Sequence, residues 1–381
     1  MKRYVLLAAA CLAVAGSTVL TQSPTEALDY AMLTRIRNEG LGRSQVMDHA
    51  SWLTDVYGPR LTGTPAMSES ADWIAKRFAE WGLSNVHRET FPFGKGWSLV
   101  RFSAHMVEPQ VQPLTGYPKT WTPGTSGKIV ADVMRVDIAS ERDFDSYRGK
   151  LAGKILLTQP ARHVDLLEGT VVHRWDEESL EEAQRTPFTS TDAFLFAGPA
   201  AAQRARTEAS FADKLEAFFR AEKVVATFDR GSDQYLVRGD NQMQWMTQRT
   251  DGGTVFIGHG GPRDERAGSG VPAVTLAVEH YNRMVRVLEK NVPVRVEIDT
   301  QVQFHEEKAE NGFNLVADLP GQDLKDEVVL LGAHLDSYPW ATGATDNAAG
   351  VAVMMEAMRI LRTIGAAPRP TIRVGLWGGG G

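Results

Sequence analysis

The feature that most constrains the fold is a strand pattern followed by a loop, a long helix pattern and another strand pattern. The run Glu327 to Gly332 (EVVLLG) is almost continuously apolar, which is typical of a strand buried on both faces of a parallel sheet. A helix pattern covers 347–364, and Gly365 and Pro368 end it. Residues 371–377 (TIRVGLW) form the next strand pattern. Strands joined by one helix run parallel with a right-handed crossover, so the sequence predicts an α/β fold.

The helix pattern at 347–364 has a broad apolar stripe. Its members are Val351, Met354, Met355, Met358 and Leu361, widened by Val353, Ala357 and Ile360. Polar side chains are few on this segment, the main ones being Glu356, Arg359, Arg362 and Thr363. We therefore expect a largely buried helix.

The loop between the strand and the helix, His334 to Asp346 (HLDSYPWATGATD), carries groups that bind metals. Sheets of this kind bind ligands beyond the carboxyl ends of their strands. Imidazole nitrogen and carboxylate oxygen are ligands for zinc and similar ions. Asp336 is placed to accept the other N–H of the imidazole and so fix its tautomer. Asp346 lies at the start of the helix, where the helix dipole favours an anion.

The same loop also fits a purely structural role. A single histidine is commonly a core or surface residue, and Asp346 fits a helix cap. The aromatic stretch Tyr338, Pro339 and Trp340 fits a lid, an apolar wall or ordinary packing. The spacing alone leaves the metal site and the structural role open.

The first residues have the pattern of a secretory signal peptide. Lys2 and Arg3 precede an apolar run that ends at Ala15, and Ala13-Val14-Ala15 fits a cleavage site. We expect a signal peptide over 1–15, with cleavage as late as residue 27, and a secreted or periplasmic protein. The run is shorter than the about 20 residues of a membrane span. A lipoprotein site at Cys11 is the weaker alternative, because it would leave a very short apolar region.

Composition excludes several classes of function. The formal net charge of -6 provides no basic surface for nucleic acid. Cys11 is the only cysteine, so the mature chain has no disulfide, no thiolate nucleophile and no cysteine ligand. No later segment has the length and apolarity of a membrane span. Nothing in the sequence indicates an oligomeric state.

The length of 381 residues predicts two domains. Helix patterns dominate up to residue 82, whereas glycine and proline turns separate short β-rich runs after about residue 109. We expect 28–108 to begin the main domain, 109–288 to be an inserted β-rich domain, and 289–381 to return to the main domain.

The segment GAHLDSYPWATGATDNAAGVAVMMEAMRIL, which begins at Gly332, resembles the metal-binding segment of the co-catalytic di-zinc peptidases, the family of bacterial aminopeptidases and carboxypeptidase Q. Tyr57 to Pro65 (YGPRLTGTP) is similar to a segment of the carboxypeptidase Q-like members, and 109–288 resembles their protease-associated domain. The resemblance implies a zinc-peptidase (phosphorylase/hydrolase-like) mixed sheet with helices on both faces. It also implies two zinc ions and removal of an amino- or carboxyl-terminal residue from peptides or dipeptides.

The resemblance assigns roles to the three loop residues. His334 falls on a ligand of one zinc, Asp336 on the residue that orients this histidine for catalysis, and Asp346 on the ligand shared by both ions. Family members often have a non-proline cis peptide bond after the shared aspartate, so the bond between Asp346 and Asn347 is expected to be cis.

The family's next functional residues fall on Gly380 and Gly381. The family has a glutamate there that acts as general base and a second glutamate that binds zinc, and glycine does neither. An acid and a histidine on later segments complete the family's ligand set. We therefore expect a fragment, truncated within the catalytic domain, that binds zinc weakly, has no turnover and leaves strand 371–377 at an exposed edge. The alternative is a non-catalytic protein that binds a peptide or another partner.

Overall fold

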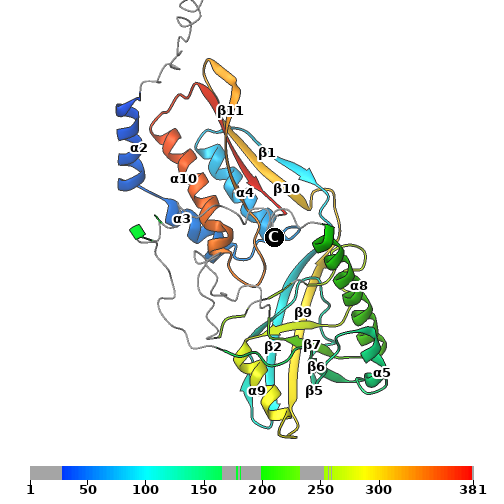
Figure 1. Cartoon of the computed structure of the whole chain (residues 1–381). Coiled ribbons are helices and arrows are strands. Elements are labelled where there is room, and N and C mark those ends of the chain that lie inside the picture. Colours follow the sequence, from blue (N-terminus) through cyan, green and yellow to red (C-terminus); the bar gives the residue numbers. More distant parts are fainter. Residues whose placement is uncertain are drawn as a thin grey trace, which may run out of the picture.

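The computed structural model describes residues 28–164, 177–178, 181, 199–231, 253–255, 257–258 and 260–379. The expected signal peptide and the two positions of the family's glutamates, Gly380 and Gly381, lie outside these residues. Figure 1 shows two sheets, each packed with its own helices. Among the described residues, no helix has the length and apolarity to cross a membrane.

The first sheet is mixed and contains the predicted parallel pair. Its strand order is β1-β10-β12-β11. The strands are β1 (Ser84–Phe91), β10 (Gly312–Leu319), β11 (Leu324–His334) and β12 (Pro370–Trp377). β11 and β12 run parallel, whereas β10 is antiparallel to both β1 and β12. The α/β class predicted from the strand, helix and strand pattern is therefore confirmed.

Helices α4 (Pro65–Glu80) and α10 (Ala349–Thr363) pack on this sheet. α4 begins where the sequence favours a start, because the Thr64 side chain accepts from the backbone N–H of Met67 and Pro65 follows it. Apolar side chains of both helices form one buried cluster with β10 and β12. Both helices therefore cover the same face, and the helical layer expected on the other face is not found in the described part of the chain.

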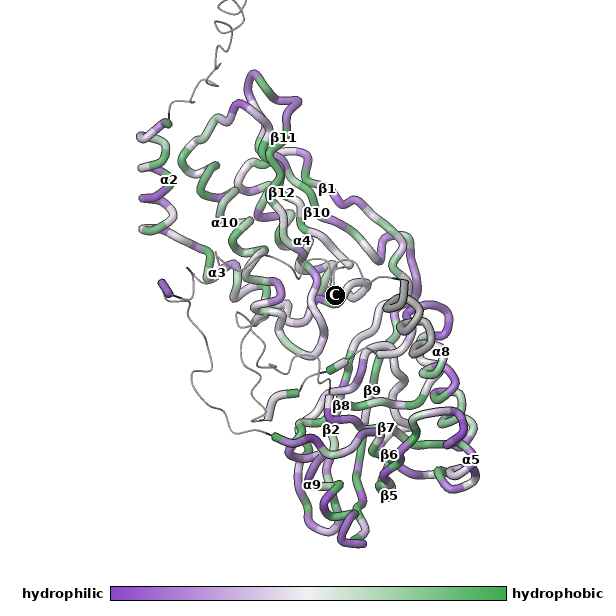
Figure 2. The backbone as a smooth tube through the Cα atoms, in the orientation of Figure 1, coloured by the Kyte–Doolittle hydropathy of each residue, from purple (hydrophilic) through white to green (hydrophobic). Residues whose placement is uncertain are grey.

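The second half of β11 carries the apolar run (Figure 2). Much of the strand is nevertheless exposed. It pairs with β12 alone among the described strands, and Val328, Val329 and Leu330 are half exposed. The predicted burial on both faces is therefore wrong for this part of β11. The expected edge is also reversed, because β12 is an inner strand between β10 and β11. An apolar run indicates a strand that gains from burial, but the neighbouring elements decide whether it is covered.

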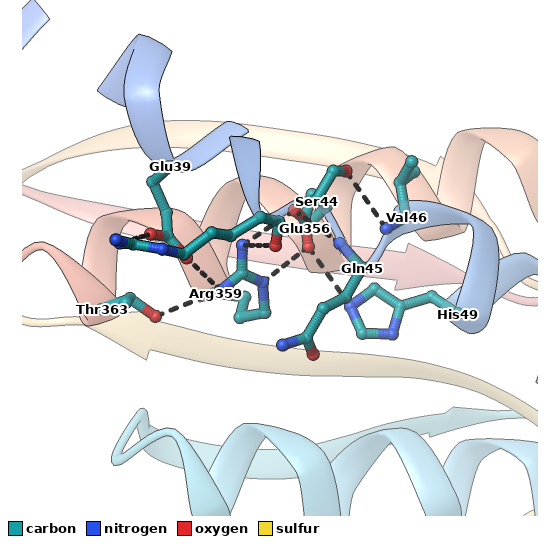
Figure 3. Close-up of polar contacts among 9 residues, drawn as sticks. Glu39, Ser44, Gln45, Val46, His49, Glu356, Arg359 and Thr363 are labelled. Atoms are coloured by element: carbon teal, nitrogen blue, oxygen red, sulfur yellow. Dashed lines mark hydrogen bonds and ion pairs between the residues drawn. The ribbon is translucent and has the colours of Figure 1, made fainter. Parts of the chain in front are cut away.

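Two helices of the N-terminal part of the chain contact α10. They are α2 (Tyr30–Gly42) and α3 (Val46–Ser51), and a short π-helix (Trp52–Val56) follows α3. Figure 3 shows charged side chains of α2 and α10 facing each other. Arg359 donates to Glu356 from Nε (2.7 Å) and Nη2 (2.9 Å), and to Glu39 from Nη1 (2.8 Å). All three side chains are buried, so this ion cluster holds α2 against α10.

The second sheet has eight strands in the order β3-β2-β9-β5-β6-β7-β8-β4. The strands are β2 (Gly96–Glu108), β3 (Gln112–Pro113), β4 (Gly116–Pro118), β5 (Ile129–Arg135), β6 (Lys154–Leu157), β7 (Ala226–Asp229), β8 (Ala273–Leu276) and β9 (Arg295–His305). Its helices are a short 3-10 turn (Glu141–Asp143), α5 (Phe144–Tyr147), α8 (Pro199–Ala221) and α9 (Val278–Leu288).

The long strands β2 and β9 form one antiparallel ladder, from Gly96 opposite His305 to Glu108 opposite Arg295. The second sheet therefore reaches beyond the predicted insert limits of 109 and 288 on both sides. The reason is physical: a strand pattern shows that a segment is extended but not which sheet it joins. Ile155 and Leu157 pack in a cluster with α9, and Leu156 between them packs with α8, so both faces of this sheet carry a helix.

Candidate metal site at the carboxyl end of strand β11

The structure brings the two predicted zinc ligands into contact. His334 is the last residue of β11, and Asp346 lies in the irregular turn Ala344–Ala348 that leads into α10. His334 Nε2 is 2.8 Å from Asp346 Oδ1, and the side chains are 30% and 66% exposed. The peptide bond between Asp346 and Asn347 is cis, as predicted. Both donors therefore face each other at a position that solvent reaches.

Asp336 lies behind the imidazole, as expected. His334 Nδ1 is 3.1 Å from the backbone oxygen of Asp336 and 3.3 Å from its Oδ1. The Asp336 side chain is fully buried. Both neighbours of Nδ1 are acceptors, so the proton of the neutral ring belongs on Nδ1 and Nε2 keeps its lone pair. This is the tautomer and orientation that a metal-binding histidine needs.

The donor set fits zinc in chemistry but is small. Zinc holds nitrogen and oxygen ligands at about 2.0–2.2 Å, which places two tetrahedral ligands about 3.3 Å apart. The 2.8 Å between His334 Nε2 and Asp346 Oδ1 would have to widen by about half an ångström, which the exposure of Asp346 permits. The described residues contain no group of three or more His, Cys, Asp or Glu side chains placed to hold a metal. They therefore supply two donors where a zinc site usually has three or four protein ligands.

The tip of the loop is anchored to the second sheet. The Tyr338 and Trp340 rings stack with their centroids 4.4 Å apart and an interplanar angle of 13°. The Tyr117 hydroxyl on β4 donates to the backbone oxygen of Pro339 at 2.6 Å, and burial raises the pKa of Tyr117 to about 12. The aromatic stretch thus packs on itself, and its central carbonyl is held from the neighbouring unit.

Gly343 provides the turn that returns the chain to α10. Its φ is +66°, in the left-handed region that favours glycine, and its oxygen accepts from the Ala348 N–H at 2.9 Å. A Cβ at this position would lie 2.4 Å from the Ser337 Cβ and 3.0 Å from Arg60 Nη2. The loop therefore closes on Ser337 and on a buried arginine. Sequence reasoning gave this arginine no role, although it stands in the YGPRLTGTP segment.

Comparisons with known proteins relate part of this chain to peptidases. Residues 314–379 match the model of Peptidase family M28, and this range contains all three loop residues. The chain is 22% identical to carboxypeptidase Q of Mus musculus over 328 residues, which are 85% of this chain and 56% of the relative. It is 23% identical to the Bos taurus carboxypeptidase Q over 340 residues, which are 89% of this chain and 59% of the relative. The chain thus spans under three fifths of the length of these relatives.

A shorter match and a solved structure complete the comparison. Leupeptin-inactivating enzyme 1 of Streptomyces exfoliatus is 35% identical over 79 residues, 21% of this chain and 18% of that enzyme. The structure of a peptidase M28 precursor from Shewanella amazonensis superposes with a TM-score of 0.54 at 20% identity, covering 92% of this chain and 66% of the other. This superposition shows a shared fold.

Proposed function

We propose that this chain, whose residues 314–379 match Peptidase family M28, carries the first part of the metal site of a zinc-dependent exopeptidase acting on peptides or dipeptides. The observation that carries this proposal is the contact of His334 Nε2 with Asp346 Oδ1 at the carboxyl end of a parallel strand, with buried Asp336 behind the ring. Relatives named carboxypeptidase Q support a peptide substrate. In this proposal the residue that is removed stands at one end of the substrate peptide.

The three loop residues have distinct roles in this proposal. His334 and Asp346 would hold zinc, with Asp346 as the shared ligand, and Asp336 would hold the Nδ1 proton of His334. Bound zinc lowers the pKa of a water molecule and polarises the scissile carbonyl. The family's general base, worth about 10²–10⁴-fold in rate, and the remaining ligands are assigned to positions outside the described residues. We also propose export of the protein by the segment at 1–15.

With two donors among the described residues, we propose that this chain by itself binds zinc weakly and has no turnover. The same observation favours the second candidate function, a non-catalytic protein that binds peptides. The two functions differ in one measurement, because a binding protein retains peptides in zinc-free buffer and a partial enzyme site does not.

Zinc titration of the purified chain tests the proposal. We expect weak binding that is lost in His334→Ala and in Asp346→Asn. His87→Ala is the matched control, because His87 Nε2 also lies near a carboxylate, 3.7 Å from Glu89 Oε1, but on β1. Zinc binding that depends on His87 as much as on His334 would overturn the metal site. Stoichiometric zinc with hydrolysis of dipeptides and amino-acid amides would overturn the proposal that this chain is incomplete.

A further inference from the structure

Arg60 is the arginine beneath the loop, and its side chain is completely buried. It stands just before α4, far from the loop in sequence. Its guanidinium donates to five backbone oxygens at 2.7–3.1 Å, those of Leu53, Gly58, Leu335, Thr342 and Gly343. Such a bond from a charged donor is among the stronger hydrogen bonds in proteins. One side chain thus links the first part of the chain to both ends of the loop.

The backbone of Arg60 adds further contacts with the middle of the loop. Its N–H donates to Ser337 Oγ at 2.9 Å, and its carbonyl accepts from the Ser337 N–H at 3.1 Å. The loop is therefore held at its beginning, at residue 337 and at its return. These attachment points lie between His334 and Asp346, the two residues whose separation defines the candidate site.

Each attachment point lies close in sequence to one of the two candidate metal ligands, His334 or Asp346. Leu335 follows His334, so fixing its carbonyl fixes the backbone that carries the imidazole. The Gly343 oxygen accepts from Arg60 and also from the Ala348 N–H, which sets the turn that contains Asp346. Two loop carboxylates also favour the charged form of this side chain. Burial lowers the pKa of Arg60 to about 10, whereas the charges of Asp336 and Asp346 raise it. The guanidinium therefore stays charged at neutral pH beside both carboxylates.

We propose that Arg60 is a positioning residue that holds the loop in the one conformation in which His334 and Asp346 face each other. The link to zinc rests on the proposed function; the control of loop conformation does not. Lysine cannot replace Arg60, because an ammonium offers donors from a single point and cannot reach five carbonyls on separate segments.

Hydrogen exchange of the full chain, read by mass spectrometry, tests this role in Arg60→Lys and Arg60→Met. Three loop amides report on it, because the N–H groups of Leu335, Ser337 and Ala348 are bonded to Trp377, Arg60 and Gly343. We expect these amides to exchange at least about tenfold faster in both variants, the loss of a single bond to a charged donor being sufficient for that. The lysine variant keeps the charge, so a defect in it shows that the planar fork is required.

Arg359→Met is the matched control, because Arg359 is similarly buried but bonds to α2 and α10 instead of the loop. It should loosen α2 without a selective change at 335–348. Loop amides that keep the wild-type rate in Arg60→Lys, or that respond equally to Arg359→Met, would overturn the role of Arg60. If Arg60→Met does not fold, the lysine variant decides.

Zinc titration of the same proteins separates the two proposals. We expect at least about tenfold weaker zinc binding in both Arg60 variants and unchanged binding in the control. Faster loop exchange with no zinc bound by any protein, the wild type included, would refute the zinc site and leave the loop role of Arg60 standing. Wild-type zinc affinity in variants with a loosened loop would refute the link between Arg60 and the metal.

Discussion

Arg359→Met should destabilise the unit built on the first sheet by about 3 kcal/mol at pH 7.5, the lower end of the about 3–5 kcal/mol found when one partner of a buried ion pair is removed. The structure supports the lower end. Glu356, only 6% exposed, loses two short hydrogen bonds but keeps the one donated by the Gln45 N–H at 3.1 Å. Methionine fills a similar volume, so cavity formation adds little.

The pH dependence of this effect has a definite sign. Burial by itself would raise the pKa of Glu356, but the bonds from Arg359 and from the Gln45 N–H lower it below the ordinary 4.5. In the wild type this carboxylate therefore contributes stability above pH 4.5 that is lost as the pH falls through the lowered pKa. In Arg359→Met the effect of burial prevails, so the pKa of Glu356 rises. Protonation of Glu356 then removes the buried unpaired charge and restores part of the lost stability. The gap between the two proteins should narrow as the pH falls from 7.5 to about 4.

Urea unfolding at both pH values measures this gap. Fluorescence is a suitable signal, because the Trp73 and Trp81 rings lie near His49, which is 3.4 Å from a Glu356 oxygen. Arg77→Met is the control, since its 2.8 Å pair with Glu80 is exposed and should contribute under about 1 kcal/mol. A loss below about 1 kcal/mol for Arg359→Met at pH 7.5, or a gap that stays constant with pH, would refute the reasoning.

Other substitutions test the loop and the edge of the sheet. Gly343→Ala should accelerate hydrogen exchange of the loop and lower stability by about 1–3 kcal/mol, because the left-handed φ and the Ser337 side chain both oppose a Cβ; wild-type exchange would contradict this. Tyr117→Phe should lower the free energy of unfolding by about 0.5–1.5 kcal/mol at pH 8. The wild type should lose stability between pH 10 and 12, because its raised Tyr117 pKa makes the buried phenol lose its contribution there, and the variant should lose less. Equal alkaline unfolding curves of the two proteins would contradict this. Val329→Lys on β11 should reduce light scattering at high concentration with under about 0.5 kcal/mol change in stability, and unchanged scattering would show that this edge does not associate.

The sequence predicted the strand, helix and strand unit well because its signal is local. Val351, Met355 and Met358 recur on one face of a helix, and these side chains are buried as expected. Val353, expected to widen the same face, is half exposed. The apolar stripe predicted where α10 packs, but the width of the covered face depends on neighbours that periodicity does not describe.

The buried arginines were beyond local reasoning for a related reason. Arg359 was counted among the few polar residues of the helix, and its burial depends on Glu39, 320 positions earlier. Arg60 bonds to carbonyls up to 283 positions away, so no window of sequence contains its partners. The pairing of His334 with Asp346 was accessible because the chemistry of both side chains and the strand end that presents them are encoded in one short segment. Their assignment as zinc ligands stays a prediction.

The position of the two candidate zinc ligands depends on contacts outside the loop that carries them. α10 begins just after Asp346, and the chain around it is held by Arg60 before its first turn and by Arg359 along its buried face. Only Arg60 bonds to the loop itself, so its link to Leu53 and Gly58 in the N-terminal segment is what we expect to fix where His334 and Asp346 stand. It follows that weak zinc binding by this chain would reflect the number of donors and not their misplacement. Variants of Arg60 and of His334 distinguish these causes, because the first alters loop exchange together with affinity and the second alters affinity alone.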